Sequence, residues 1–241
     1  MRWFASIVML VISLCACNSP ISAESGDAPY ACIPPARPAA KTAIQPRVSV
    51  IGDSYTGGSP QGGNGDRRWT SLVNAQLRSR GIEAAVKVGA EGGAGYVAGG
   101  RRTGEVFADK IQAAVRSGDK VVVAFGSIND AKAPSGKLAR ATCDTLRSIE
   151  ITAPAAHLLV IGPPWVTSDP PPEILQARDI LHARARELGA TFIDPIADGW
   201  FVDRPDLIGA DGVHPTDEGH EYMAQKIGPV IERLLAEPLT R

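Results

Sequence analysis

The order of short apolar runs and helical segments is the feature that most constrains the fold of this chain. Five runs rich in Val, Ile, Leu or Ala are too short for helices, and they lie at residues 48–51, 84–88, 121–125, 158–161 and 191–193. Each run is followed by a segment that can form a helix. Strands that alternate with helices are typical of a parallel sheet covered on both faces. The sequence therefore predicts an α/β fold, a three-layer α/β/α sandwich with a central five-stranded parallel sheet.

The helical segments show apolar residues at helical spacing, and several are followed by glycine. Trp69, Leu72, Val73 and Leu77 mark one face of the first such segment, and Gly81 ends it. Helices are expected over residues 69–77, 106–118, 138–149, 174–188 and 222–234. Functional residues in folds of this class gather beyond the carboxyl ends of the strands, so the segments that follow the strands are the places to search for a site.

The N-terminal residues indicate export. Arg2 precedes an apolar stretch at residues 3–14, which is shorter than the roughly 20 residues that span a bilayer. The stretch ends in Leu14-Cys15-Ala16-Cys17, which resembles the lipobox of bacterial lipoproteins, whose final Cys is acylated. Residues 1–17 are thus predicted to be a signal peptide with a lipobox and Cys17 the lipidation site. An ordinary signal peptide cut further on, after Ala23, is the alternative.

The remaining 224 residues divide into a linker and one domain. Residues 18–46 are rich in Pro, Ala and Ser and predict an extended tether, and residues 47–241 are expected to form the folded domain. Cys32 and Cys143 remain as an even pair in an oxidising compartment, which makes a disulfide between them plausible. Two unrelated buried thiols are the alternative.

Charge and ligand spacing exclude some functional classes. The 25 basic and 26 acidic residues are interspersed, so the charge balance gives no reason to expect nucleic acid as a partner. No Cys-x-x-Cys or paired His spacing indicates a metal site, and no cofactor is expected. The chain is predicted to be a monomer.

Four segments carry residue types that are suited to catalysis, and each segment precedes a helix or follows a strand. They are Gly52-Asp53-Ser54-Tyr55, the glycine-rich residues 89–96, Ser127-Ile128-Asn129-Asp130, and Asp211-Gly212-Val213-His214-Pro215. Each alone is a weak signal, because a turn, a cap or an ordinary loop explains it. All four together, in this order and at these places, are much less common by accident than any one of them.

This combination resembles the SGNH hydrolases, also called GDSL-type esterases, from about Arg47 to the C-terminus. The resemblance implies a flavodoxin-like sheet with Ser54 as nucleophile, His214 as general base and Asp211 as the residue that orients His214. It further implies three oxyanion donors, namely the Ser54 N–H, the Gly93 N–H and the Asn129 side chain, with Gly92 as a near alternative to Gly93. One departure stands out: Ser127 occupies a position where the family usually has glycine, and Gly126 lies one residue earlier.

These residue types suit acyl transfer. A serine hydroxyl needs a base to accept its proton, and the imidazole base needs a carboxylate to fix its tautomer. The sequence therefore predicts an exported serine esterase that cleaves small-molecule, lipid or carbohydrate esters through an acyl-enzyme and is held at the membrane by an N-terminal lipid, or else secreted. The alternatives are an O-acetylesterase or acyltransferase acting on envelope carbohydrate, and a catalytically silent binding protein with the same fold.

Overall fold

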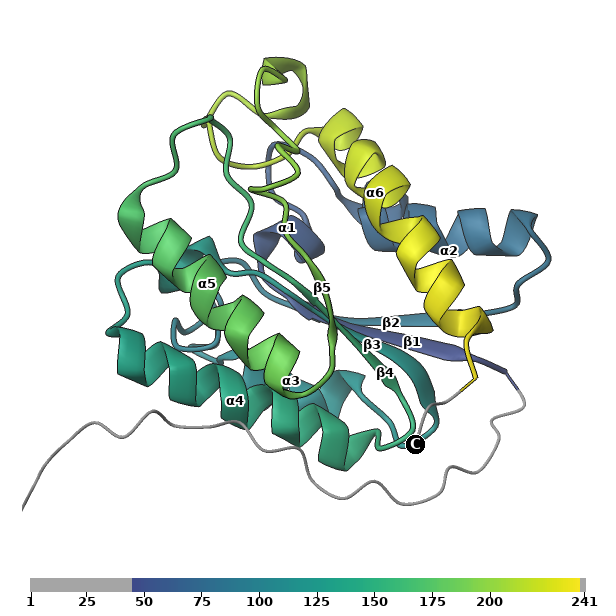
Figure 1. Cartoon of the computed structure of the whole chain (residues 1–241). Coiled ribbons are helices and arrows are strands. Elements are labelled where there is room, and N and C mark those ends of the chain that lie inside the picture. Colours follow the sequence, from purple (N-terminus) through teal and green to yellow (C-terminus); the bar gives the residue numbers. More distant parts are fainter. Residues whose placement is uncertain (1–44, 239–241) are drawn as a thin grey trace, which may run out of the picture.

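All five expected strands form, and they lie in one parallel sheet in the order β2-β1-β3-β4-β5 (Figure 1). The computed structural model describes residues 45–238. The strands are β1 (Arg47–Gly52), β2 (Ala85–Ala90), β3 (Asp119–Phe125), β4 (His157–Ile161) and β5 (Thr191–Ile193). Because all are parallel, their carboxyl ends meet at one edge, and the predicted fold class is confirmed.

Helices cover both faces of this sheet (Figure 1). The longer ones are α2 (Trp69–Ser79), α3 (Phe107–Ala114), α4 (Ser135–Thr152), α5 (Pro172–Glu187) and α6 (Asp217–Ala236). Helices α3, α4 and α5 pack on one face, and α2 and α6 pack against each other on the opposite face. The short helix α1 (Ser54–Gly57) lies at the carboxyl end of β1.

Alternation along β3 explains the two cores. Val122 and Ala124 face the side of α3, α4 and α5, whereas Val121, Val123 and Phe125 face the side of α2 and α6. Successive strand residues point to opposite faces, so a strand covered on both faces needs a continuous apolar run. Burial of each Val or Phe side chain here contributes roughly 1.5–3 kcal/mol.

Two helix ends differ from the expectation for physical reasons. Helix α6 starts at Asp217 rather than near residue 222, because Thr216 Oγ1 accepts the Gly219 N–H at 3.1 Å and caps the first turn. Helix α3 ends at Ala114 rather than near residue 118. There Asp119 Oδ2 accepts the Arg116 N–H at 2.8 Å and holds the turn into β3. Local caps thus override the apolar spacing at these ends.

The predicted signal peptide, Cys17, Cys32 and nearly all of the tether lie outside the described residues. Cys143 is buried on α4 and is bonded in a disulfide, and its pairing with Cys32 stays a prediction. Among residues 45–238, no helix is long and apolar enough to cross a membrane.

Candidate active site

Ser54 sits at the carboxyl end of β1, in a turn that its neighbours fix. Asp53 caps α1, and its Oδ1 accepts the Tyr55 N–H at 2.9 Å. Gly52 is needed at this point, because a Cβ there would lie 2.3 Å from Thr56 Oγ1 and 3.2 Å from the Phe125 carbonyl oxygen. The strand end and the capped turn therefore present Ser54 at the edge of the sheet.

The structure brings Ser54, His214 and Asp211 into one chain of hydrogen bonds. His214 Nε2 lies 3.0 Å from Ser54 Oγ, and His214 Nδ1 lies 2.6 Å from Asp211 Oδ2. Asp211 Oδ1 also accepts the backbone N–H groups of Val213 and His214 at 3.0 and 2.9 Å. The His214 N–H, followed by the ring of His214, lowers the pKa of Asp211 to about 2. An ionised Asp211 keeps the proton on Nδ1 and leaves Nε2 free to accept from Ser54.

Tyr55 fastens the loop that carries His214. Its hydroxyl donates a hydrogen bond to the Val213 carbonyl oxygen, which lies 158 residues further along the chain. Burial raises the pKa of Tyr55, so the hydroxyl stays protonated and remains a donor. The Gly209 N–H donates to the His214 carbonyl oxygen at 2.8 Å, and Ile208 pairs with Pro215 as an isolated antiparallel bridge. These contacts set the position of the imidazole.

The glycine-rich segment lies beside Ser54. A Cβ on Gly92 would lie 3.7 Å from Ser54 Cβ, whereas a Cβ on Gly93 would lie 2.7 Å from Arg101 Cγ. The N–H groups of Gly92 and Gly93 donate to no acceptor within residues 45–238. Gly92 is thus the one of the two glycines that borders the nucleophile.

Asp130 fixes the end of the glycine-rich segment. Its buried carboxylate accepts the N–H groups of Tyr96, Val97 and Ala98 at 2.7, 3.0 and 2.8 Å. A Cβ on Gly95 would approach the same carboxylate to 2.5 Å, so glycine is required there. The loop after β3 thereby holds the loop after β2.

Asn129 belongs to a compact polar network with Asp53 and Ser127. Asn129 Nδ2 lies 2.8 Å from Ser127 Oγ, 2.9 Å from the Ala94 carbonyl oxygen and 3.3 Å from Asp53 Oδ2. Ser127 Oγ in turn accepts the Asn129 N–H at 3.0 Å and donates toward Asp53 or Ala94. The serine in the glycine position therefore supports Asn129. An oxyanion at Ser54 would have to draw one amide N–H from this network.

Burial shapes the electrostatics of that network. Asp53 is almost fully buried, and this burial raises its pKa to about 6. The sequence alone gave no role to Tyr55. Its contact crosses 158 residues and leaves no spacing signal.

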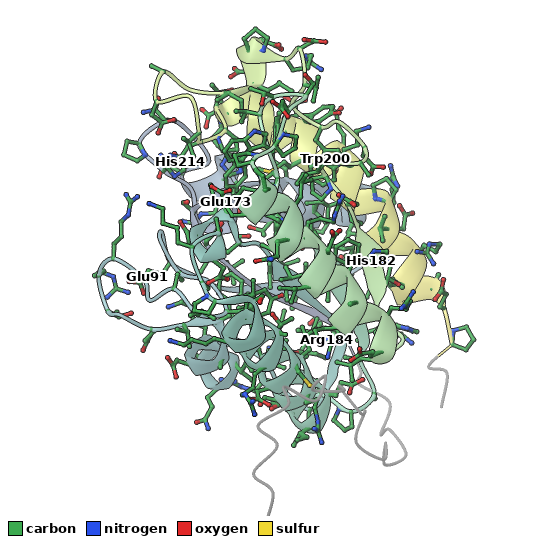
Figure 2. The ribbon with its side chains drawn as sticks, turned by 60° about the vertical axis from the view of Figure 1, so that its left-hand side comes forward. Glu91, Glu173, His182, Arg184, Trp200 and His214 are labelled. Atoms are coloured by element: carbon green, nitrogen blue, oxygen red, sulfur yellow. The ribbon has the colours of Figure 1, made fainter. Side chains whose placement is uncertain are left out.

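Other polar and aromatic residues lie apart from this chemistry. Trp200 is buried in the core against Phe125, and Figure 2 shows His182 and Arg184 far along α5 from His214.

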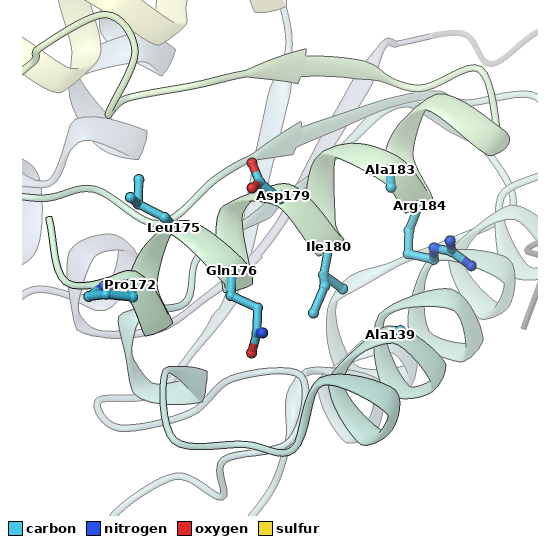
Figure 3. Close-up of a pocket in the computed structure, with 8 residues that line it drawn as sticks. All are labelled: Ala139, Pro172, Leu175, Gln176, Asp179, Ile180, Ala183 and Arg184. Carbon is cyan, nitrogen blue, oxygen red and sulfur yellow. The ribbon is translucent and has the colours of Figure 1, made fainter. Parts of the chain in front are cut away.

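A cavity of about 520 Å³ runs along α4 and α5 between Ala139 and Arg184, and it includes none of the predicted site residues (Figure 3). A smaller cavity of about 260 Å³ borders the loop of Asp211 and His214, and it is lined by residues that include Val166, Phe201, Ile208 and Gly212. Within residues 45–238, no group of three or more His, Cys, Asp or Glu side chains is placed to hold a metal ion.

Comparisons with known proteins agree with the fold. The chain matches the GDSL-like Lipase/Acylhydrolase family over residues 50–222. It is 52% identical over 187 residues to a GDSL lipase from Mycobacterium tuberculosis, an alignment that covers 76% of this chain and 80% of that protein.

Two solved structures share the fold at low sequence identity. A lipase/acylhydrolase from Enterococcus faecalis has a TM-score of 0.65 at 19% identity, covering 78% of this chain and 96% of that one. A carbohydrate esterase family 3 protein from Talaromyces cellulolyticus has a TM-score of 0.59 at 18% identity, covering 79% and 98%.

The fold, with its serine at the carboxyl end of the first strand and its late Asp-x-x-His segment, thus defines a class of ester-hydrolysing enzymes. The chain belongs to the GDSL-like lipase/acylhydrolase family, as its resemblance to the SGNH hydrolases implied. It is an enzyme that hydrolyses ester bonds, and the reading as a catalytically silent binding protein is not supported.

Proposed function

We propose that this enzyme cleaves carboxylic esters through an acyl-enzyme on Ser54. The hydrogen-bond chain from Ser54 Oγ through His214 to Asp211 is the observation that carries the proposal. Ser54 Oγ bonds to the ester carbonyl carbon as its proton moves to His214 Nε2. The carbon–oxygen bond to the alcohol then breaks, and the alcohol takes the proton from His214. Water repeats these steps on the acyl-enzyme and releases the acid.

The developing oxyanion needs donors that are already in place. The Ser54 N–H, the Gly92 N–H and the Asn129 side chain are our candidates, since the first two donate to nothing else within the described residues. Each donor of this kind is worth about 2.7–4 kcal/mol in comparable sites. Asp53 and Ser127 would act on Asn129 rather than on the substrate.

The substrate is proposed to be a small or accessible ester. The support is that the side chains of His214 and Asp211 are 16% and 35% exposed, so the catalytic base lies at an accessible surface. A second candidate is an acyl group on carbohydrate, because one protein with the same fold is a carbohydrate esterase. A chain-length series of chromogenic esters, run beside acetylated sugars, separates the two.

The test of the chemistry is Ser54→Ala, assayed with 4-nitrophenyl acetate and butyrate. The variant should fall to the background rate while its melting temperature stays close to that of the parent. Ser59→Ala is a matched control from the same loop, and it should keep its turnover. Undiminished hydrolysis by Ser54→Ala would contradict the assignment of Ser54 as the nucleophile.

We further propose export and lipid attachment through Cys17. The support is the apolar stretch at residues 3–14 and the segment Leu14-Cys15-Ala16-Cys17. A Cys17→Ala chain should be released or keep its leader, and Cys15→Ala should fractionate with membranes as the parent does. If both variants match the parent in mass and fractionation, the proposed lipid site is wrong.

A further inference from the structure

A loop of residues 99–105 follows the glycine-rich segment and folds back beside it. The Arg101 N–H donates to the Gly92 carbonyl oxygen at 3.0 Å, so the loop is tied to the residue that borders Ser54. Glu91 Oε1 accepts the N–H groups of Arg102 and Thr103, both at 2.7 Å. Figure 2 shows Glu91 and His214 toward the same side of the molecule. The loop is therefore fixed in position near the nucleophile.

The two neighbouring arginines of this loop have different electrostatic surroundings. Arg102 Nη2 lies 3.8 Å from Glu91 Oε2, although its side chain is 80% exposed. Arg101 is also exposed, and within residues 45–238 its guanidinium makes no ion pair and no hydrogen bond. Its stem lies against Gly93, where a Cβ would be 2.7 Å from Arg101 Cγ and 3.4 Å from Nε. Arg101 thus leans toward the glycines of the site rather than toward Glu91.

The carboxylates of this region have other partners. Glu91 already contacts Lys110 Nζ at 2.9 Å, and Asp211 is bound to His214. Asp53 and Asp130 are buried within their own hydrogen-bond networks. Arg101 packs on Gly93, the residue that follows Gly92, and Gly92 borders Ser54. A free guanidinium at this place attracts anions and offers a planar fork of N–H donors that suits a carboxylate or a phosphate.

We propose that Arg101 determines specificity by binding an anionic group, a carboxylate or a phosphate, on the ester substrate. The inference rests on the proposed function, since Ser54 must be the nucleophile for Arg101 to border the reacting ester. Partial exposure and solvent screening limit the benefit to about fivefold to tenfold in kcat/KM. A neutral ester gains nothing from the charge.

The test compares charged and neutral esters of equal shape on the full chain. On the alcohol side, 4-acetoxybenzoate and 4-acetoxyphenyl phosphate stand against methyl 4-acetoxybenzoate. On the acyl side, mono(4-nitrophenyl) adipate stands against 4-nitrophenyl hexanoate. The parent should prefer the anionic member of at least one pair. Arg101→Gln should lose that preference by about fivefold to tenfold in kcat/KM, and 0.5 M NaCl should weaken it in the parent.

Arg102→Gln is the matched control, because it removes the same charge from the next residue. It should change kcat/KM for every ester by less than about twofold, while Arg101→Lys should retain part of the preference. Equal losses in Arg101→Gln and Arg102→Gln, an equal loss on neutral esters, or no loss at all would overturn the assignment to Arg101. A parent that hydrolyses none of these esters would instead contradict the proposed function.

Discussion

The two halves of the active site are built in different ways. The nucleophile half, formed by the loops after β1, β2 and β3, is held by buried carboxylates, since Asp53 and Asp130 together accept several hydrogen bonds. The base half is one loop before α6, and the side chain of Asp211 is 35% exposed. The halves meet at the contact of Ser54 Oγ with His214 Nε2 and at the bond from Tyr55 to Val213.

This difference predicts whether a substitution should change stability, the rate of hydrolysis, or both. Changes to the buried carboxylates Asp53 and Asp130 disturb a shared network, so they should alter stability as well as the rate. Changes in the exposed loop should alter the rate with little effect on stability, because few buried contacts depend on it. The predictions below test this contrast, from the largest expected effect to the smallest.

Asp211→Asn should lower kcat by about 10³–10⁴-fold, because an amide cannot fix the required tautomer of His214 or stabilise its protonated form. The melting temperature should change little. Steady-state kinetics with 4-nitrophenyl acetate measures the loss. Asp206→Asn, which removes an exposed carboxylate nearby that pairs with Arg204, is the control and should keep its rate. A kcat within tenfold of the parent would mean that Asp211 does not orient the base.

Asn129→Ala should lower kcat by about 10²–10³-fold and leave KM nearly unchanged, because the oxyanion exists only in the transition state and intermediate. The resting contacts of Asn129 point into the network of Asp53 and Ser127, so the melting temperature is measured in parallel. If KM or stability changes while kcat stays within about threefold, Asn129 supports the loop only, since that ratio is under roughly 1 kcal/mol of barrier.

Asp53 should give stability a distinct pH dependence. Its pKa is raised to about 6, against about 3.9 in an unfolded chain, so the folded state binds the proton more tightly between these values. Raising the pH from 3 to 7 should therefore lower the parent's free energy of unfolding, relative to Asp53→Asn, by up to about 3 kcal/mol. Above pH 7 the difference should stay constant. Urea unfolding at four pH values measures it, and a difference that grows with pH would reverse the sign of the argument.

Tyr55→Phe should have the smallest effect, about fivefold in kcat, because it removes one hydrogen bond worth about 1 kcal/mol from the base loop. The loss should appear in kcat with KM nearly constant. Tyr222→Phe is a control for loss of a hydroxyl, because Tyr222 lies on α6 with its ring beside Phe201. Equal rates in the parent and Tyr55→Phe would show that the other loop contacts suffice.

Much of the fold was predictable because its signals are local. Apolar runs such as Val121 to Phe125 are continuous wherever a strand is covered on both faces, so the strand order along the chain could be read from the sequence. Helix ends were less predictable. Caps such as Thr216, and turns such as that of Asp119 with Arg116, depend on single hydrogen bonds that apolar spacing does not report.

The site residues fall into the same two groups, those marked by local sequence signals and those whose contacts only the structure reveals. Ser54, Asp211 and His214 lie at segment positions that a family pattern can mark, and the structure brings them together. Partners across long sequence distances could not be predicted, as with the Tyr55 hydroxyl on Val213. Which of Gly92 and Gly93 borders Ser54 also needed the structure, because adjacent glycines look the same in a sequence.

The most direct test of the central claim is to label the enzyme with a fluorophosphonate and map the adduct by peptide mass spectrometry. The two halves of the site should cooperate to activate one hydroxyl. We expect a single adduct on Ser54 in the parent, slower labelling of the same residue in Asp211→Asn, and no adduct in Ser54→Ala. An adduct on another serine, or labelling of Ser54→Ala at the parent's rate, would contradict the account.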